Sequence, residues 1–149
     1  MSISKNWAFV FSLLCFFASA VSSASDASKL RLQSSYELMS AENKAMQDDA
    51  SINPAMFWVG DGDALWNRPS EQNGKSCASC HGDAKKSMRG VATVFPKIIK
   101  GKLQTLEGQI NQCRSQAQAT KPLAYESKDL LALAAYIAYQ SKGLPIAVH

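Results

Sequence analysis

The run Cys77-Ala-Ser-Cys80-His81 constrains this chain more than any other feature of its sequence. Two thiols three positions apart on a turn can each add to one vinyl group of a haem, and the histidine that follows can then bind the iron from one face. The run is therefore typical of a covalently attached c-type haem. We expect Cys77 and Cys80 to hold one haem c and His81 to be a ligand of its iron.

Two other kinds of site use the same residues. A Cys-x-x-Cys pair can form a redox-active disulfide, although the strand–helix context of a thioredoxin-like site is missing here. Cys77, Cys80, His81 and Cys113 also supply the ligands of a Cys₃His zinc site. Neighbouring residues such as Cys80 and His81 rarely both reach one tetrahedral ion, so the sequence favours haem.

The N-terminus indicates the compartment. Lys5 precedes an apolar stretch over residues 7–21, and small residues close that stretch. This order is typical of a secretory signal peptide, and the stretch is short for a retained membrane anchor. We expect residues 1–24 to be removed after Ala24, with Ala20 as the second choice. The mature protein is then periplasmic, with no membrane attachment.

Removal of the signal peptide leaves an odd number of cysteines, because Cys15 leaves with it. Disulfides use cysteines in pairs, so one thiol of the mature chain needs another explanation. The spacing of Leu103, Leu106, Ile110 and Cys113 predicts one face of a helix and places Cys113 on its buried side. Cys113 is either a buried free cysteine or the second axial ligand of the iron.

The other candidate ligands after His81 are few. Met88 follows seven residues later, a short loop in which to reach the opposite haem face, and His149 ends the chain, where order is usually poor. The sequence therefore favours Cys113. An anionic sulfur ligand stabilises ferric iron, so we expect a low reduction potential.

Composition and periodicity predict one all-α domain. The chain has 149 residues, of which 46% are hydrophobic and 19% charged, as in ordinary globular proteins. Its net charge of +4 is spread without a basic stripe, so we expect no nucleic-acid partner. We divide the chain into the signal peptide, a polar arm over residues 25–52 and a cytochrome c-like domain over residues 53–149.

Two helices define the expected core of that domain. One runs over residues 54–67, and the other begins after the capping residue Ser127 and ends before Gly143. The second has an apolar stripe formed by Leu130, Leu133, Ala134 and Ile137. We expect these helices to pack together, with both Trp58 and Trp66 buried and the haem in a cleft beside them. No alternating pattern predicts a strand.

Several segments together resemble the SoxA family of cytochromes. The haem motif is one of them, within Gly74-Lys-Ser-Cys-Ala-Ser-Cys-His-Gly82. The others are Tyr36-Glu-Leu-Met39, Met46-Gln-Asp-Asp49, Asn53-Pro54 with Trp58, Leu106-Glu-Gly-Gln-Ile-Asn-Gln-Cys-Arg114, Tyr125-Glu-Ser127 and Gln140-Ser-Lys-Gly-Leu-Pro145. The resemblance covers nearly all of the expected mature chain and is specific well beyond the haem motif.

The resemblance implies a function. SoxA is the larger cytochrome subunit of the SoxAX complex of periplasmic thiosulfate oxidation, which attaches thiosulfate to a cysteine of the carrier SoxYZ with loss of two electrons. Its N-terminal haem has histidine and cysteine ligands, which correspond to His81 and Cys113. A SoxX-like subunit and SoxYZ are the implied partners, and L-cysteine S-thiosulfotransferase is the implied family activity.

The catalytic haem of that family lies in a second domain, which we expect this chain to lack. The chain then carries an electron-transfer or structural haem and is not catalytic alone. The alternative is a stand-alone monohaem cytochrome c that transfers electrons without sulfur chemistry.

Overall fold

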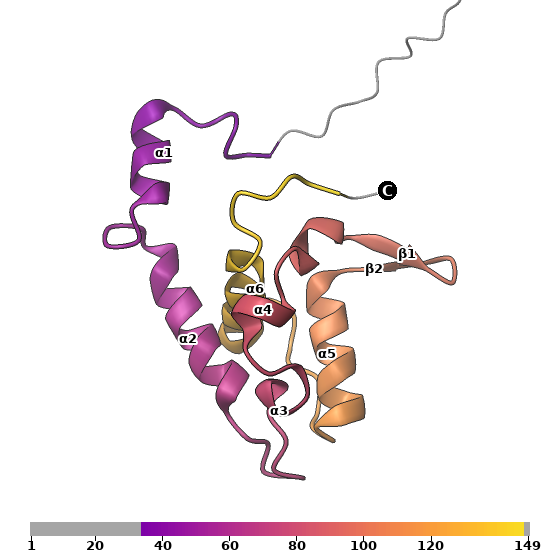
Figure 1. Ribbon diagram of the computed structural model, residues 1–149. Helices are drawn as coiled ribbons and strands as arrows, with labels where there is room; N and C mark the ends of the chain where they lie inside the picture. Colours follow the sequence, from indigo (N-terminus) through magenta and orange to yellow (C-terminus); the bar gives the residue numbers. More distant parts are fainter. Residues whose placement is uncertain (1–33, 148–149) are drawn as a thin grey trace, which may run out of the picture. The chain divides into compact units, whose positions relative to one another are not determined.

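Helices form most of the described chain (Figure 1). The computed structural model describes residues 34–147, so the expected signal peptide lies outside the described residues. The elements in chain order are α1 (Ala41–Asp48), α2 (Ala55–Asn67), α3 (Cys77–His81), α4 (Ala84–Ser87), the 3₁₀-helix η1 (Val91–Val94), β1 (Lys97–Ile99), β2 (Lys102–Gln104), α5 (Leu106–Ala117) and α6 (Lys128–Tyr139). The expected all-α class is confirmed apart from one short hairpin.

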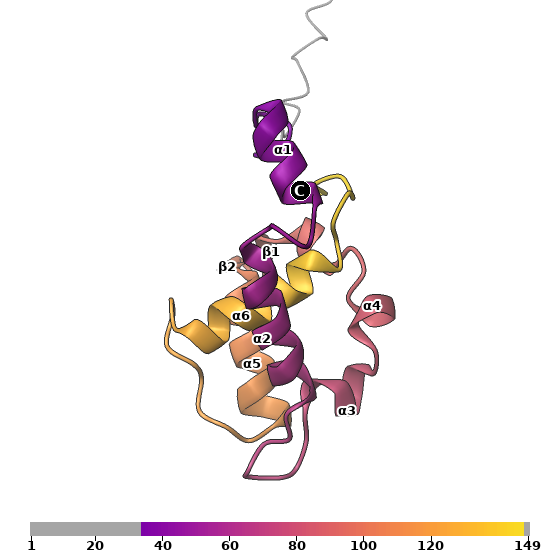
Figure 2. The same ribbon diagram turned by 90° about the vertical axis from the view of Figure 1, so that its left-hand side faces the viewer.

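The core lies where α2 crosses α6, as Figure 2 shows. The expected apolar stripe of α6 is buried, and Leu130 and Leu133 are the largest side chains with almost no exposed surface. Gly62 brings the two backbones together, because a Cβ at this position would collide with the Ala132 carbonyl group and the Tyr136 Cβ. The expected pairing of these two helices is confirmed.

The two tryptophans of α2 have different environments. Trp66 is 3% exposed and belongs to the core, as expected, whereas Trp58 is 39% exposed. The expectation that both are buried was wrong for Trp58. Trp66 lies near the end of α2, where it contacts Tyr136 of α6 and His81 of α3, whereas Trp58 lies in the first turn of α2.

The hairpin of β1 and β2 replaces the expected first turn of a longer helix. The strands pair antiparallel, with Ile98 opposite Leu103. Leu103 is 65% exposed, so the expectation that it shares the buried face of Cys113 was wrong. The helix begins three residues later because the Thr105 Oγ1 accepts a hydrogen bond from the Gly108 N–H at 3.0 Å and caps α5 at that point.

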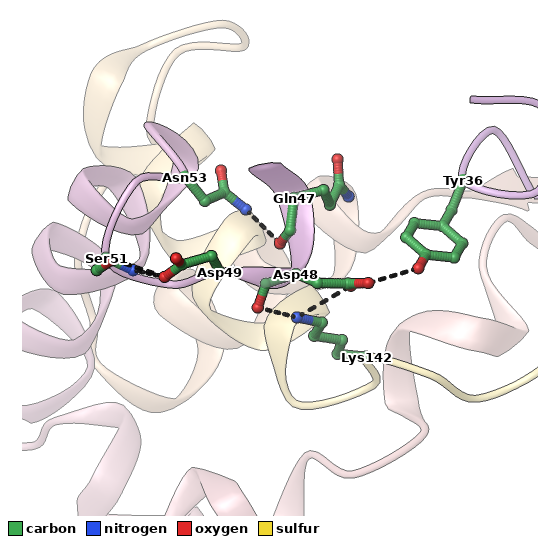
Figure 3. A network of polar contacts seen from close by, with 7 residues as sticks. All are labelled: Tyr36, Gln47, Asp48, Asp49, Ser51, Asn53 and Lys142. Carbon is green, nitrogen blue, oxygen red and sulfur yellow. Dashed lines mark hydrogen bonds and ion pairs between the residues drawn. The ribbon is translucent and has the colours of Figure 1, made fainter. Parts of the chain in front are cut away.

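The first described helix, α1, is held by polar contacts rather than by the core, since none of its residues is buried. Figure 3 shows the network around Asp48. The Tyr36 hydroxyl donates to Asp48 Oδ2 at 2.6 Å, and the Lys142 Nζ lies 3.6 Å from Asp48 Oδ1. The Asn53 Nδ2 donates to the Gln47 carbonyl oxygen at 3.0 Å at the same end of the helix. The Lys142 contact connects α1 to the chain that follows α6.

Within residues 34–147, none of the helices is both long enough and apolar enough to cross a membrane.

Candidate functional site

One short helix, α3, carries three of the four expected site residues. Its start is fixed by a capping box, in which the Ser76 Oγ accepts from the Ser79 N–H at 3.0 Å and the Ser79 Oγ accepts from the Ser76 N–H at 2.9 Å. Gly82 ends the helix with φ +66°, and its N–H donates to the Ala78 carbonyl oxygen at 2.8 Å. The local sequence therefore confines Cys77, Cys80 and His81 to little more than one turn.

That single turn places the three side chains on one side of the helix. Residues three and four positions apart are neighbours on a helix surface, and Cys80 and His81 stand in that relation to Cys77. Cys77 is half-buried, whereas Cys80 and His81 are exposed. All three cysteines of the described chain are free thiols, so the structure contains no disulfide within residues 34–147.

Trp66, at the end of α2, contacts the end of α3. Its ring centroid lies 5.7 Å from that of His81, with the two planes tilted by 39°. The indole Nε1 donates a hydrogen bond to the Gly82 carbonyl oxygen at 3.0 Å. The sequence predicted the burial of Trp66, but it gave no sign of this contact with the histidine of the motif.

The fourth expected residue, Cys113, lies on α5 and is half-buried. One turn earlier on the same helix, Gln109 donates from its Nε2 to the Cys113 Sγ at 3.5 Å. The end of α5 reaches the motif itself, because the buried Gln118 donates from its Nε2 to the Cys77 Sγ at 3.7 Å. Sequence reasoning missed both glutamines, since their only signal is helical spacing from Cys113.

Burial raises the pKa of the Cys77 thiol, while the positive charge of Arg114 and the hydrogen bond from Gln118 act in the opposite direction. The Cys113 thiol raises the pKa of Cys77 further, through repulsion between the two sulfur charges. The residues that bear on Cys77 thus include both Cys113 and its neighbour Arg114. The structure brings α5 and the motif into one region, although 36 residues of sequence separate these cysteines.

Arg114 has an unusual environment. Its Nε is buried and has no hydrogen-bond partner among the described residues, and its Nη1 donates to the Gln118 Oε1 at 3.5 Å. A cavity of about 230 Å³ borders the guanidinium, with Arg68 and Asp129 also in its lining. An unpartnered buried N–H beside free thiols is consistent with a region that receives a further group.

The donor set fits haem c better than the alternatives. Two thiols and an imidazole on one turn, with a further thiol on α5, supply both attachment points and both kinds of iron ligand. The Met88 side chain belongs to the hydrophobic core instead, and His149 lies outside the described residues. In the described part of the chain no three His, Cys, Asp or Glu side chains lie together as a metal-binding group, so the zinc alternative gains no support.

A groove of about 490 Å³ lies between α2, α6 and the chain from Ala78 to Lys85, and Trp66 is part of its lining. Tyr136 lines this groove, and its ring centroid lies 5.9 Å from that of Trp66. Burial, together with a hydrogen bond to Asp63, raises the pKa of Tyr136 to about 12. The tyrosine therefore remains a neutral hydrogen-bonding group at physiological pH.

Comparisons with known proteins agree with this architecture. A family model described as the SoxA/TsdA cytochrome c domain matches residues 61–146. L-cysteine S-thiosulfotransferase subunit SoxA of Rhodovulum sulfidophilum is 34% identical over 119 residues, which are 78% of this chain and 42% of that protein. The protein of the same name from Pseudaminobacter salicylatoxidans is 36% identical over 108 residues, which are 71% of this chain and 38% of that protein.

A solved structure is similar as well. The crystal structure of SoxXA from P. pantotrophus matches with a TM-score of 0.70 and 29% identity, over 79% of this chain and 45% of the matched chain. The chain thus spans about two-fifths of the length of the curated relatives it matches. A cytochrome c domain carries covalently bound haem, which confirms the expected type of cofactor. The family resemblance is confirmed too, and the chain belongs to the SoxA/TsdA family of cytochrome c domains.

Proposed function

We propose that this chain is a haem domain of the SoxA type that carries one haem c, bound through Cys77 and Cys80, with His81 and Cys113 as ligands of its iron. The observation that carries the proposal is the hydrogen bond from Gln118, the residue directly after α5, to the Cys77 Sγ, at 3.7 Å. It joins the end of the helix that carries the fourth cysteine to the first residue of the motif. That arrangement supports Cys113 as the partner of His81.

Each residue of the site has a separate role in this proposal. The two thiols of α3 would hold the haem by adding to its vinyl groups: each addition would break an S–H bond and a C=C π bond and form one C–S and one C–H bond, without net oxidation. The capping box of Ser76 and Ser79 fixes the turn on which both thiols lie. The Gln109 N–H donates to Cys113 and offsets part of the negative charge of a thiolate there.

The bound haem supplies one-electron transfer. A thiolate ligand stabilises the ferric state, so the domain holds a low-potential haem. We assign it an electron-transfer or structural role rather than the catalytic one. The sulfur-transfer activity named for the SoxA relatives belongs, in this proposal, to the complete subunit together with a SoxX-like partner and the SoxYZ carrier, in the periplasm after removal of residues 1–24.

Low-temperature EPR of the oxidised protein, produced in a haem-maturing periplasm, tests the ligands. We expect a low-spin ferric signal with the narrow g-spread of thiolate ligation and a mass increase of one haem. Cys113→Ala removes that signal, whereas the control Met88→Leu, a change within the core, preserves it. A histidine–methionine signal that persists in Cys113→Ala and disappears in Met88→Leu contradicts the assignment.

Two further measurements test the wider role. A redox titration is expected to give a low midpoint potential, and a clearly positive one argues against a thiolate ligand. Co-purification with a SoxX-like cytochrome tests the partner, and a haem-loaded domain that binds no such protein favours an independent electron carrier. N-terminal sequencing of the exported protein locates the cleavage site.

A further inference from the structure

In the part of the chain that the structure describes, the imidazole of His81 does not make the hydrogen bond that usually orients an iron-bound histidine. Such a ring normally donates its second N–H to a carbonyl or carboxylate group, which fixes its plane. Within residues 34–147 neither nitrogen of His81 makes a hydrogen bond. Its side chain is exposed, on the last residue of a five-residue helix. The ring contact that His81 makes within the described residues is with Trp66.

Trp66 makes that contact at two points. Its ring lies against the imidazole, with centroids 5.7 Å apart. Its Nε1 donates to the carbonyl oxygen of Gly82, the residue directly after His81, at 3.0 Å. The indole therefore contacts both the backbone directly after His81 and the imidazole ring itself.

Trp66 is rigidly placed, which a positioning residue requires. Its side chain is 3% exposed and packs against Tyr136 of α6, with centroids 5.9 Å apart. One turn earlier on α2, the close approach at Gly62 fixes the distance between α2 and α6. The indole is thus anchored in the core, whereas the imidazole it contacts is exposed.

We propose that Trp66 is the positioning residue for His81 and sets the plane of the imidazole relative to the iron. This inference rests on the proposed function, because it requires His81 to be an iron ligand. The indole acts through ring contact and through the hydrogen bond to Gly82. It does not touch the iron.

The test compares Trp66→Phe with Trp58→Phe in the haem-loaded protein. Phenylalanine keeps an aromatic ring in the core but removes the N–H that binds Gly82. Trp58 lies on the same helix, is 39% exposed and has no aromatic ring contact within the described residues, so it is the matched control. The orientation of an axial imidazole contributes to the rhombic splitting of a low-spin ferric signal, so a change in that orientation is expected to change the g-values or the line widths.

We expect Trp66→Phe to broaden the single low-spin signal or split it into two, with the haem content unchanged, and Trp58→Phe to superimpose on the parent. A Trp66→Phe signal with the parent's g-values and line widths overturns the inference alone. A parent protein without haem, or with a haem that His81 does not bind, overturns the proposed function and this inference together. If Trp66→Phe fails to accumulate, Trp66→Tyr, which also lacks the indole N–H, provides the same comparison.

Discussion

Replacement of Gly62 by alanine tests whether the close contact of α2 with α6 holds the domain together. A Cβ at this position falls well inside van der Waals contact with the Ala132 carbonyl group and the Tyr136 Cβ. Ala132 is fully buried, so its backbone has little space into which to move. The two helices must therefore separate, or bend, to accept one methyl group.

Two opposing effects determine how much Gly62→Ala changes the free energy of unfolding. Alanine is favoured over glycine in a helix interior by about 1 kcal/mol. An added methyl group in a close-packed core costs about 1–3 kcal/mol, and a collision with backbone belongs at the upper end of that range. The net loss of unfolding free energy is therefore about 1–2 kcal/mol. For a domain of this size it lowers the melting temperature by about 4–8 °C.

Thermal unfolding followed by far-ultraviolet circular dichroism measures the effect. Gly60→Ala is the matched control, because a Cβ there meets nothing within 4 Å. It gains the helix-propensity term alone and is expected to raise the melting temperature by about 2–5 °C. A Gly62→Ala protein that melts at or above the temperature of the parent refutes the reasoning.

Three other predictions have defined outcomes. Leu133→Ala removes a fully buried side chain and is expected to lower the free energy of unfolding, measured in urea, by about 2–5 kcal/mol. Leu131→Ala, at a site that is 41% exposed, is the control and is expected to lower it clearly less. Equal losses in the two variants contradict the described core. Thr105→Ala removes a capping hydroxyl that accepts a backbone N–H at 3.0 Å, and it is expected to lower the free energy of unfolding by about 1 kcal/mol. The Ser127 Oγ is buried without a partner among the described residues, so Ser127→Ala is expected to be neutral or stabilising. A larger loss of stability in Ser127→Ala than in Thr105→Ala contradicts this prediction. Because folding raises the pKa of Tyr136 to about 12, its contribution to stability is complete below the pKa of an unfolded tyrosine and is lost as the pH rises toward 12. Urea unfolding at about pH 9 and about pH 11 measures that loss, and Tyr136→Phe is expected to reduce it; an identical decline in both proteins opposes the assignment.

Local patterns predicted the helices of the core well. In α6, Ser127 occupies the predicted N-cap position, although its Oγ makes no capping hydrogen bond, and the apolar stripe from Leu130 to Ile137 forms the predicted buried face. The helix of the motif could be predicted from the sequence equally well, because a Cys-x-x-Cys-His run is typical of one kind of site and requires a turn. Features of this kind depend only on residues within about one turn of each other.

The features that sequence reasoning missed depend on distant residues or on weak local signals. The strands of the hairpin have three residues each, too few for an alternating pattern, and the exposed Leu103 shows that no core demanded one. The burial of Trp66 goes with its contacts to Tyr136 and His81, which are distant from it in the sequence. The contact of Gln118 with Cys77 spans 41 positions, and neither residue predicts the other.

The candidate site divides in the same way. Cys77, Cys80 and His81 are predicted to be site residues from their own spacing, and their roles stay predictions. Cys113 was identified from an odd cysteine count, and its role as a ligand stays a prediction, since no neighbouring residue marks it. The structure adds the hydrogen bonds of Gln109 and Gln118, which follow from the position of α5.

Core packing and site geometry depend on the same contact. The close approach at Gly62 fixes the separation of α2 and α6, and Trp66 follows one turn later on the same helix. Trp66 contacts Tyr136 on one side and His81 on the other. A substitution that separates the two helices therefore displaces the neighbour of the histidine without touching α3. The stability of the core and the orientation of the proposed iron ligand should consequently change together. A variant that alters one of the two without the other shows that they are not coupled at the substituted position.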